Sequence, residues 1–391
     1  PLPYTTVAQR PMSRHRMPKL VTKLYSLAYL RRIAPRWVLS ALRRHVSLTE
    51  ARTAAAEAAA PFKGQQAHSS YEPRYPYTLG IIKEFWHRHS PYIAACRDLK
   101  VAYRVIDISG PDWIDVIQNS GCDAFLVWPS VQLSIWKQMY DERLKVMVEE
   151  MGKTIYPTYR ELWLWESKRR MHYWLEANNI PHPKTSVFYD REEALCFARR
   201  ANLPVVYKSN MGSAASGVTV FRQRSALLRF VNRCFRRGVL SGARDRLDRE
   251  WGNVLLQEYL PNVNEWRVLR LGESYFAHLK LRMGDFHSGS GEVAWSRPPK
   301  RLLDFVRRIT EKGGFTSMNV DAFETADRHF LVNELQPMFG SYLDYQMLIE
   351  GRPGRFLFDH HKQQWTFEEG TFNHNASCNL RVQALLDLLG Q

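Results

Sequence analysis

The sequence predicts an α/β domain followed by a mixed α+β module, with a basic helical extension in front of both. Between residues 76 and 158, short apolar runs alternate with helical patterns, which is typical of a parallel sheet covered by helices. After residue 253, apolar runs follow one another closely, which indicates antiparallel strands. The 391-residue chain is 45% hydrophobic and 13% aromatic, so it is long and apolar enough for two or three packed domains.

The first domain is expected to be a scaffold on the substrate side, because it carries no glycine-rich dinucleotide fingerprint. A helix is entered at Pro111, a favoured first position. The expected strands are 77–85, 102–108, 123–130 and 154–158, and the expected helices are 89–99, 111–120 and 131–151.

The later elements fall into a small α+β unit and a larger α+β module. One long helix is expected from residue 159 until Pro181 ends it. A short apolar helix, 379–390, can dock on the body or on a second copy, so a homo-oligomer stays open. Between these helices we expect strands at 186–190, 204–210, 218–221, 253–261, 265–273, 275–283, 317–325 and 329–337, and helices at 191–202, 225–236 and 300–312.

The net charge of +16 is unevenly distributed. Residues 1–50 hold ten Lys and Arg and one acidic residue, so they contribute 10 − 1 = +9. Residues 19–46 fit three interpretations: helices packed on the body, an interfacial helix on an anionic membrane, or a targeting peptide. No nucleic-acid-reading motif accompanies the charge, so no nucleic-acid partner is expected.

Apolar runs and cysteines narrow the class further. No apolar run reaches the roughly 18 residues that a transmembrane helix needs. The five cysteines are scattered without a CxxC pair, which favours neither a disulfide framework nor a zinc site. We expect a cytoplasmic protein, with peripheral contact at the inner face of the membrane if residues 19–46 are interfacial.

The stretch VYKSNMGSAASGV, residues 206–218, places a lysine before a loop of small residues. Glycines let backbone N–H groups converge on phosphate oxygens, and serine hydroxyls add donors. The loop is not a P-loop, because neither Gly-Lys-Ser nor Gly-Lys-Thr closes it. Taken alone, it fits a phosphate-binding loop or an ordinary turn. The candidate residues are Lys208, Gly212, Ser213, Ser216 and Gly217.

Two carboxylates and an amide form a second motif. Asp321 and Glu334 lie on adjacent predicted strands, and Gln336 shares the face of Glu334 because side chains alternate along a strand. An oxygen-only set of this kind suits Mg²⁺. The alternative is a solvated acidic face, but both carboxylates stand in apolar stretches where an unpaired charge is costly. We therefore favour a metal site.

Polar and basic residues also mark the strands before this hairpin. Gln257 and Glu258 lie at a strand exit whose free backbone groups can read an adenine edge, and Glu265 can accept from ribose hydroxyls. The alternative is an ordinary hairpin. Lys280 and Arg282 share one strand face before a Gly/Ser loop, so they can neutralise phosphate charge while the loop closes over the site.

Taken in order, these motifs resemble the ATP-grasp superfamily, and within it the ribosomal-protein glutamate ligases and glutathione synthetases. The likeness covers roughly residues 78–350 and includes ESKRRMHYWLEANNIPHPKT, which is similar to that group's lysine-bearing helix and following turn. The resemblance implies an ATP-grasp fold. Its expected parts are a basic extension (1–75), a pre-ATP-grasp α/β domain (76–158), a lid with its linking helix (159–255), a C-terminal subdomain with the metal site (256–365) and a tail helix (366–391).

The resemblance also implies a role for each candidate residue. Gln336 stands where the family usually has Asn, so the metal position can shift. The loop after GDF carries His287, Ser288 and Gly289, where the glutamate ligases carry Arg and Asn. By the resemblance, Lys168 and Lys208 contact phosphates under the loop of Gly212, Ser213, Ser216 and Gly217; Gln257, Glu258 and Leu260 hold adenine and Glu265 the ribose; Arg267, Lys280 and Arg282 face the γ-phosphate and acyl phosphate; and Asp321, Glu334 and Gln336 bind Mg²⁺ or Mn²⁺.

The activity that the resemblance implies is an ADP-forming carbon–nitrogen ligase, which joins a carboxylate to a small-molecule amine through an acyl phosphate. A basic, interfacial N-terminus would suit a glycan uronic acid as the carboxylate. Two alternatives stay open. One is a free amino-acid or dipeptide ligase, and the other is a non-catalytic ATP-binding protein with a regulatory or structural role.

Overall fold

The computed structural model describes residues 69–212, 217–242, 245, 247–281, 293–339 and 343–390. The chain divides into two compact units, Pro1–Ala60 and Pro61–Gln391, and every described residue belongs to the second unit. The segment 19–46 and its three interpretations therefore lie outside the described residues. Within the described part, no helix combines the length and the apolar character that crossing a bilayer requires.

The first sheet has five strands in the order β1-β3-β2-β4-β5. Strands β2 to β5 run parallel, as the alternation of strands and helices predicts, and β1 pairs antiparallel with the edge of β3. A helix follows each of the first three parallel strands. The chain must cross back to the same end of the sheet before the next parallel strand can begin, and the helix makes this crossover. The elements are β1 (Ser70–Tyr71), β2 (Thr78–Ile82), α5 (Ser90–Asp98), β3 (Ala102–Ile106), α6 (Trp113–Gln118), β4 (Ala124–Leu126), α7 (Ser134–Glu149) and β5 (Thr154–Tyr156).

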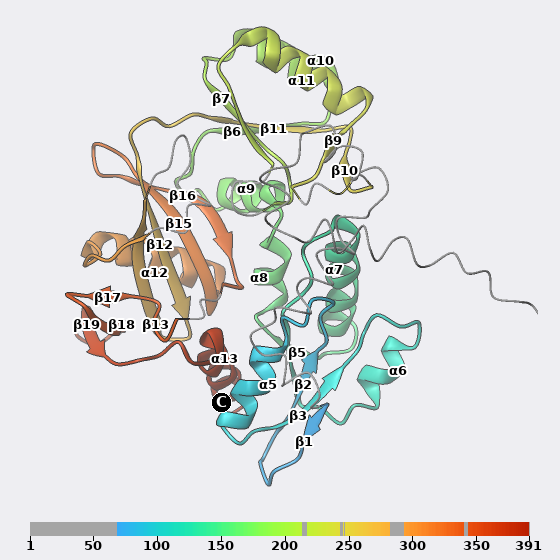
Figure 1. The fold of residues 1–391 in the computed structure, drawn as a ribbon, viewed down its shortest axis with the longest axis vertical. Coiled ribbons are helices and arrows are strands. Elements are labelled where there is room, and N and C mark those ends of the chain that lie inside the picture. Colours follow the sequence, from blue (N-terminus) through green and yellow to red (C-terminus); the bar gives the residue numbers. More distant parts are fainter. Residues whose placement is uncertain are drawn as a thin grey trace, which may run out of the picture. The chain divides into compact units, whose positions relative to one another are not determined.

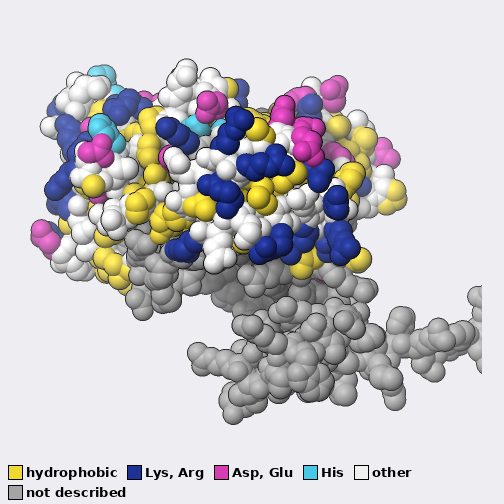
Figure 2. Space-filling model, turned by 90° about the horizontal axis from the view of Figure 1, so that it is seen from above, with side chains coloured by type: hydrophobic (Ala, Val, Ile, Leu, Met, Phe, Trp, Pro, Cys, Tyr) yellow, Lys and Arg dark blue, Asp and Glu magenta, His cyan; other side chains and the backbone are white. Residues whose placement is uncertain are grey.

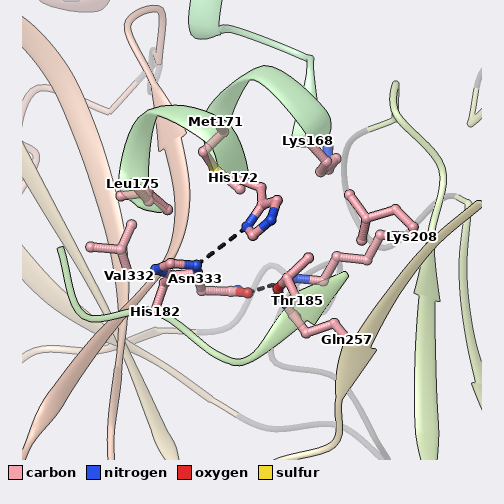
Figure 3. A pocket seen from close by; sticks show the side chains of 11 residues that line it. Lys168, Met171, His172, Leu175, His182, Thr185, Lys208, Gln257, Val332 and Asn333 are labelled. Carbon is pink, nitrogen blue, oxygen red and sulfur yellow. Dashed lines mark hydrogen bonds between the residues drawn. The ribbon is translucent and has the colours of Figure 1, made fainter. Parts of the chain in front are cut away.

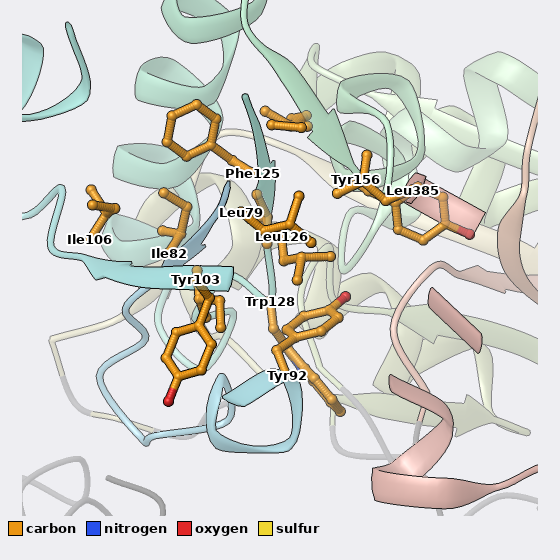
Figure 4. Packing of buried hydrophobic residues seen from close by; sticks show 14 of the residues in the cluster. Leu79, Ile82, Tyr92, Tyr103, Ile106, Phe125, Leu126, Trp128, Tyr156 and Leu385 are labelled. Atoms are coloured by element: carbon orange, nitrogen blue, oxygen red, sulfur yellow. The ribbon is translucent and has the colours of Figure 1, made fainter. Parts of the chain in front are cut away.

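The core of this domain is closed by the last helix of the chain. Leu79, Phe125 and Tyr156 are fully buried in one cluster that also includes Leu385 of α13 (His374–Leu389). Figure 4 shows Leu385 beside Tyr156, and α13 packs against α5 (Figure 1). Burial of such side chains stabilises by about 1.5–3 kcal/mol each, so α13 is an integral part of the first domain.

The single helix expected from residue 159 to Pro181 is wrong, because the structure has two helices there, α8 (Tyr159–Leu164) and α9 (Lys168–Ala177). Glu166 has a positive φ of 48° between them. Its carboxylate accepts a hydrogen bond from the Gly212 N–H at 2.9 Å, a contact with the loop after β7 (Val205–Lys208). This tertiary contact breaks the helix and sets Lys168 at the start of α9.

The segment expected to form the lid holds a four-stranded antiparallel sheet in the order β6-β11-β7-β8, and the name lid is kept for residues 185–258. Two helices, α10 and α11, cover one face of it (Figure 1). Both helices end in arginines, and Figure 2, which looks onto this side, shows Lys and Arg side chains spread over the surface. The remaining elements of the lid are β6 (Thr185–Phe188), α10 (Arg191–Arg200), β8 (Val218–Phe221), α11 (Arg224–Arg236), β9 (Val239–Leu240), β10 (Arg249–Glu250) and β11 (Val254–Glu258).

The largest sheet is antiparallel, in the order β16-β15-β12-β13-β18-β17, with β14 paired to β13 and β19 to β18. No strand is expected from the sequence between residues 348 and 369, so β17, β18 and β19 were not predicted. Helix α12 supplies Leu302, Val306 and Ile309 to the core below this sheet. The elements are β12 (Asn264–Leu271), β13 (Ser274–Lys280), β14 (Val293–Ala294), α12 (Lys300–Gly313), β15 (Ser317–Glu324), β16 (Phe330–Gln336), β17 (Leu348–Ile349), β18 (Arg352–Asp359) and β19 (Gln364–Glu369).

Candidate nucleotide and metal site

The pairing of β15 with β16 brings the two candidate metal carboxylates together. Asp321 pairs with Glu334, whereas the next residue, Ala322, pairs with Val332. Asn333 is therefore an extra residue in β16, which makes this point a β-bulge. Gln336, the third candidate ligand, is half-buried on the same strand and pairs with Asn319.

Asp321 is fully buried and is held by two cations. Its carboxylate oxygens lie 2.8 Å from Nε and 2.8 Å from Nη2 of Arg267, and one of them lies 3.0 Å from Nζ of Lys280. Burial works to raise the pKa of Asp321, but Arg267 and Lys280 outweigh it and hold the pKa well below its usual range. Asp321 is thus a carboxylate anion with both oxygens engaged.

Glu265, the candidate ribose ligand, is also buried among protein partners. Its carboxylate forms an ion pair with Lys280 and accepts a hydrogen bond from Nδ2 of Asn333 at 3.2 Å. Burial raises the pKa of Glu265, against the opposing effect of Lys280. Lys280 therefore bridges Glu265 and Asp321, which lie on neighbouring strands.

Two lysines approach β16 from different elements. Nζ of Lys168 lies 3.0 Å from Oε1 of Glu334, and Nζ of Lys208 donates to Oδ1 of Asn333 at 2.8 Å. Burial lowers the pKa of Lys208 to about 8. Burial also works to lower the pKa of Lys168, but the carboxylates of Glu334 and Glu166 outweigh it and raise the pKa above its usual value. Lys168 is accordingly a fixed cation.

The start of the small-residue loop is held by Lys168 and by the half-buried carboxylate of Glu250. Nζ of Lys168 donates to the Gly212 carbonyl, and the backbone N–H of Asn210 donates to Glu250 at 2.9 Å. Gly217 has a φ of 79°, and a Cβ there would lie 1.9 Å from the Ser209 hydroxyl oxygen, so only glycine fits. Ser213 and Ser216, the two candidate hydroxyl donors, lie outside the described residues, as does Arg282.

The candidate adenine residues lie where β11 ends. Nε2 of Gln257 donates to the Thr185 hydroxyl at 2.8 Å. The carboxylate of Glu258 accepts from the Lys184 N–H at 2.7 Å, and the Glu258 N–H donates to the Lys184 carbonyl at 2.9 Å. Leu260 follows as a half-buried residue. Glu258 therefore fastens this strand end to the turn before β6.

A cavity is lined by Lys168, Lys208, Gln257 and Asn333 among these groups (Figure 3). It lies between α9, the lid strands β7 and β11, and strand β16, with both candidate phosphate lysines in its wall. Four of its polar lining residues, His172, His182, Thr185 and Asn333, were not singled out from the sequence, although each lies within or beside a motif that was. The lining residues are Lys168, Met171, His172, Leu175, His182, Thr185, Lys208, Leu255, Gln257, Val332 and Asn333.

No model of a protein family matches the chain. The chain is 22% identical over 245 residues to the alpha-aminoadipate–LysW ligase LysX of Saccharolobus solfataricus, a match that covers 60% of this chain and 84% of that protein.

Two solved structures are similar to the chain at low sequence identity. The biotin carboxylase domain of 2-oxoglutarate carboxylase from Hydrogenobacter thermophilus, in complex with MgADP, ADP and bicarbonate, matches at a TM-score of 0.50 and 15% identity, over 68% of this chain and 65% of that chain. The N5-carboxyaminoimidazole ribonucleotide synthetase of Thermotoga maritima matches at a TM-score of 0.47 and 17% identity, over 67% and 68% of the two chains.

These findings define the class. The chain has a mixed α/β fold of the ATP-grasp type, with one mainly parallel sheet and further antiparallel sheets, so the fold class expected from the sequence is confirmed.

Proposed function

We propose that this chain is an ATP-dependent carboxylate–amine ligase that forms an amide and releases ADP and phosphate. The observation that carries the proposal is the convergence of Lys168 and Lys208 on β16, beside the paired carboxylates Asp321 and Glu334. Lysine ammonium groups are suited to phosphates, and carboxylate oxygens to Mg²⁺. The sequence match to a ligase and the likeness of fold to a protein that binds MgADP support the same reading.

The donor set fits Mg²⁺ once a nucleotide is bound. Glu334, Gln336 and Asp321 offer only oxygen atoms, which is the ligand type that Mg²⁺ prefers. In the described structure, Lys168 forms an ion pair with Glu334, while Arg267 and Lys280 form ion pairs with Asp321. A bound triphosphate would pair with these cations, which would leave the carboxylates free to bind Mg²⁺. Without the triphosphate, the same cations would repel Mg²⁺. Mg²⁺ would supply charge neutralisation of the phosphates and orient them.

In the proposed reaction, a substrate carboxylate oxygen attacks the γ-phosphorus of ATP while the bond to the β-phosphate oxygen breaks and ADP leaves. The amine nitrogen then attacks the carbonyl carbon of the acyl phosphate, phosphate leaves, and a proton passes from nitrogen to solvent. Lys168 and Lys208 would bind the phosphates, and Arg267 and Lys280 would stabilise the negative charge that develops on the transferred group. Arg282 is proposed to share that role.

For the substrates, we propose chemical classes and not individual compounds. The relative from Saccharolobus solfataricus is named for joining alpha-aminoadipate to LysW, so we propose an amino acid as one substrate. We retain a glycan uronic acid as a proposed carboxylate partner. Its support is the charge of +9 on residues 1–50, which would attract an anionic polymer.

The test is a two-part measurement on the full chain. Calorimetry with ATP, Mg²⁺ and both together should show weak binding of Mg²⁺ alone and tighter binding when ATP is present. ADP release should then be screened against a panel of carboxylates and amines that includes glutamate, alpha-aminoadipate and glucuronic acid. Release that depends on one carboxylate and one amine supports the ligase. Binding of ATP without any dependent release would favour the non-catalytic alternative, and no binding of ATP or ADP would end both.

A further inference from the structure

Three side chains that carry metal-ligating atoms converge at the C-terminal half of α9. His172 and Glu176 are four residues apart, so they share one face of the helix. His182 stands in the turn that follows α9. One ligand atom from each of the three residues lies within 4.8 Å of the other two. In Figure 3 a dashed line joins ring nitrogens of His172 and His182, whose rings lie edge to face in the wall of the cavity.

Two of the distances within this cluster match those between ligands of one ion. Nδ1 of His172 lies 3.3 Å from Nε2 of His182, and that nitrogen lies 3.2 Å from Oε2 of Glu176. A tetrahedral ion with bonds of roughly 2.0–2.1 Å separates neighbouring ligand atoms by about 3.3 Å. Two of the three separations therefore already match a site for one ion, and the third, between His172 and Glu176, is no more than 4.8 Å.

The hydrogen bond between His182 and the Ile180 carbonyl leaves the other ring nitrogen of His182 able to bind a cation. Nδ1 of His182 lies 2.7 Å from the Ile180 carbonyl, which can only accept, so this nitrogen carries a hydrogen. In the neutral ring, Nε2 then presents a lone pair, and it faces both a ring nitrogen of His172 and a carboxylate oxygen of Glu176. A metal ion satisfies all three atoms at once. The bond to Ile180 also fixes the orientation of His182, as contacts behind metal ligands commonly do.

We propose that His172, Glu176 and His182 bind a transition-metal ion, with Zn²⁺ the best fit, and leave a further coordination position open. Two imidazole nitrogens and one carboxylate are a ligand set that suits Zn²⁺, whereas Mg²⁺ prefers oxygen atoms alone. The side chain of Glu176 is 71% exposed, which gives the ion a path from solvent. This site is separate in its ligands from the oxygen set on β15 and β16, and it does not depend on the proposed ligase activity.

The proposed ion would lie beside the cavity that Lys168 and Lys208 line. His172 and His182 line the same cavity as Lys168 and Lys208, at the end away from those lysines (Figure 3). A ligand that fills the cavity from the lysine end would approach the open coordination position. Zinc bound here would therefore be partly screened from solvent.

The test is a Zn²⁺ titration of the metal-stripped full chain against a chromophoric chelator, in the presence of excess Mg²⁺. We expect the wild type to bind Zn²⁺ despite the Mg²⁺, and His172→Gln and His182→Gln to weaken this binding by about 100-fold. Glu176→Gln keeps an oxygen but loses its charge, so about tenfold is expected. His360→Gln is the matched control, because that exposed imidazole lies 4.0 Å from a single carboxylate.

Two outcomes would overturn the site: no competitive Zn²⁺ binding by the wild type, or binding that survives both histidine exchanges. In the first case the cluster is an ordinary hydrogen bond and ion pair. Circular dichroism establishes that each variant is folded. If a histidine variant does not fold, anomalous scattering at the zinc edge from wild-type crystals decides, since the peak must lie among these three side chains and not elsewhere.

Discussion

Arg267 and Asp321 face each other across β12 and β15, and the guanidinium of Arg267 grips both carboxylate oxygens of Asp321 at 2.8 Å. The planar fork of arginine matches a carboxylate in this way, and a lysine cannot replace it with one ammonium group. The guanidinium carbon also lies 4.3 Å from the centre of the Phe339 ring. The Arg267 guanidinium therefore packs on the Phe339 ring and also forms hydrogen bonds to Asp321.

We expect Arg267→Ala to lower the free energy of unfolding by about 3 kcal/mol, because it leaves the buried Asp321 carboxylate with Lys280 as its remaining cation. Arg301→Ala is the control, since Arg301 pairs with Glu324 at 2.9 Å but its own side chain is 45% exposed. That exchange should cost less than about 1 kcal/mol. Urea unfolding of the two variants measures the difference, and equal losses would contradict the structural importance assigned to the Arg267–Asp321 pair.

Glu334→Gln should separate nucleotide binding from turnover. The amide keeps the shape of the side chain but removes a negative charge, and it releases Lys168 from its ion pair. ADP release should fall by about 100-fold or more, while ATP binding without Mg²⁺ should be at least as tight as in the wild type. Calorimetry and a coupled ADP assay measure the two effects. Glu311→Gln, on the outer helix α12, is the control, and near-normal turnover in Glu334→Gln would contradict the proposed metal site.

The bulge places Asn333 between two charged groups. Its side chain accepts a hydrogen bond from Lys208 and donates one to Glu265. We expect Asn333→Asp to weaken ATP binding by about tenfold, because the new carboxylate pairs with Lys208 and repels the phosphates. Asn333→Ala should weaken it less, since it adds no charge. Asn232→Asp makes the same exchange beside Arg191 in the lid and should leave affinity unchanged. Equal affinities of the two Asn333 variants would show that charge is not the cause.

The sequence predicted most of the elements because their patterns are local. The apolar runs at β2, β3 and β4 are buried parallel strands, and such strands read as continuous hydrophobic segments. Asp321 and Glu334 could be paired in advance because two short strands joined by a tight turn have few possible registers. Lys208 was a candidate from its small-residue loop, whereas Lys168 came from the resemblance alone, and their convergence on β16 depends on how β7 and α9 are arranged.

The features that were missed depend on contacts that the local pattern does not contain. The helical periodicity continues through Glu166, and the break there comes from its bond to Gly212, 46 residues later. Asn333 was passed over because a bulge is a property of strand pairing. His172 and His182 stand ten residues apart with no spacing typical of a zinc motif, so their proximity appears only when the turn at Pro181 is folded.

His89 supplies a prediction about pH. This imidazole is 3% exposed, and its Nδ1 accepts a hydrogen bond from the Glu84 N–H at 3.0 Å. Burial, with the nearby His87 and Lys83, lowers the pKa of His89 to about 3. The folded state therefore resists the proton that the unfolded chain takes up near pH 6.5. The stability from neutral His89 is complete above pH 6.5 and is lost as the pH falls towards 3.

Between pH 7 and pH 5 this group should remove roughly 2 kcal/mol from the free energy of unfolding. His89→Asn keeps an acceptor for the Glu84 N–H but cannot be protonated, so its stability should fall by that much less over the same interval. His329→Asn, at an imidazole whose side chain is 79% exposed, should follow the wild type. Urea unfolding at both pH values measures the differences. Parallel losses in the wild type and His89→Asn would mean that other groups, such as the buried carboxylates, carry the acid sensitivity of the first domain.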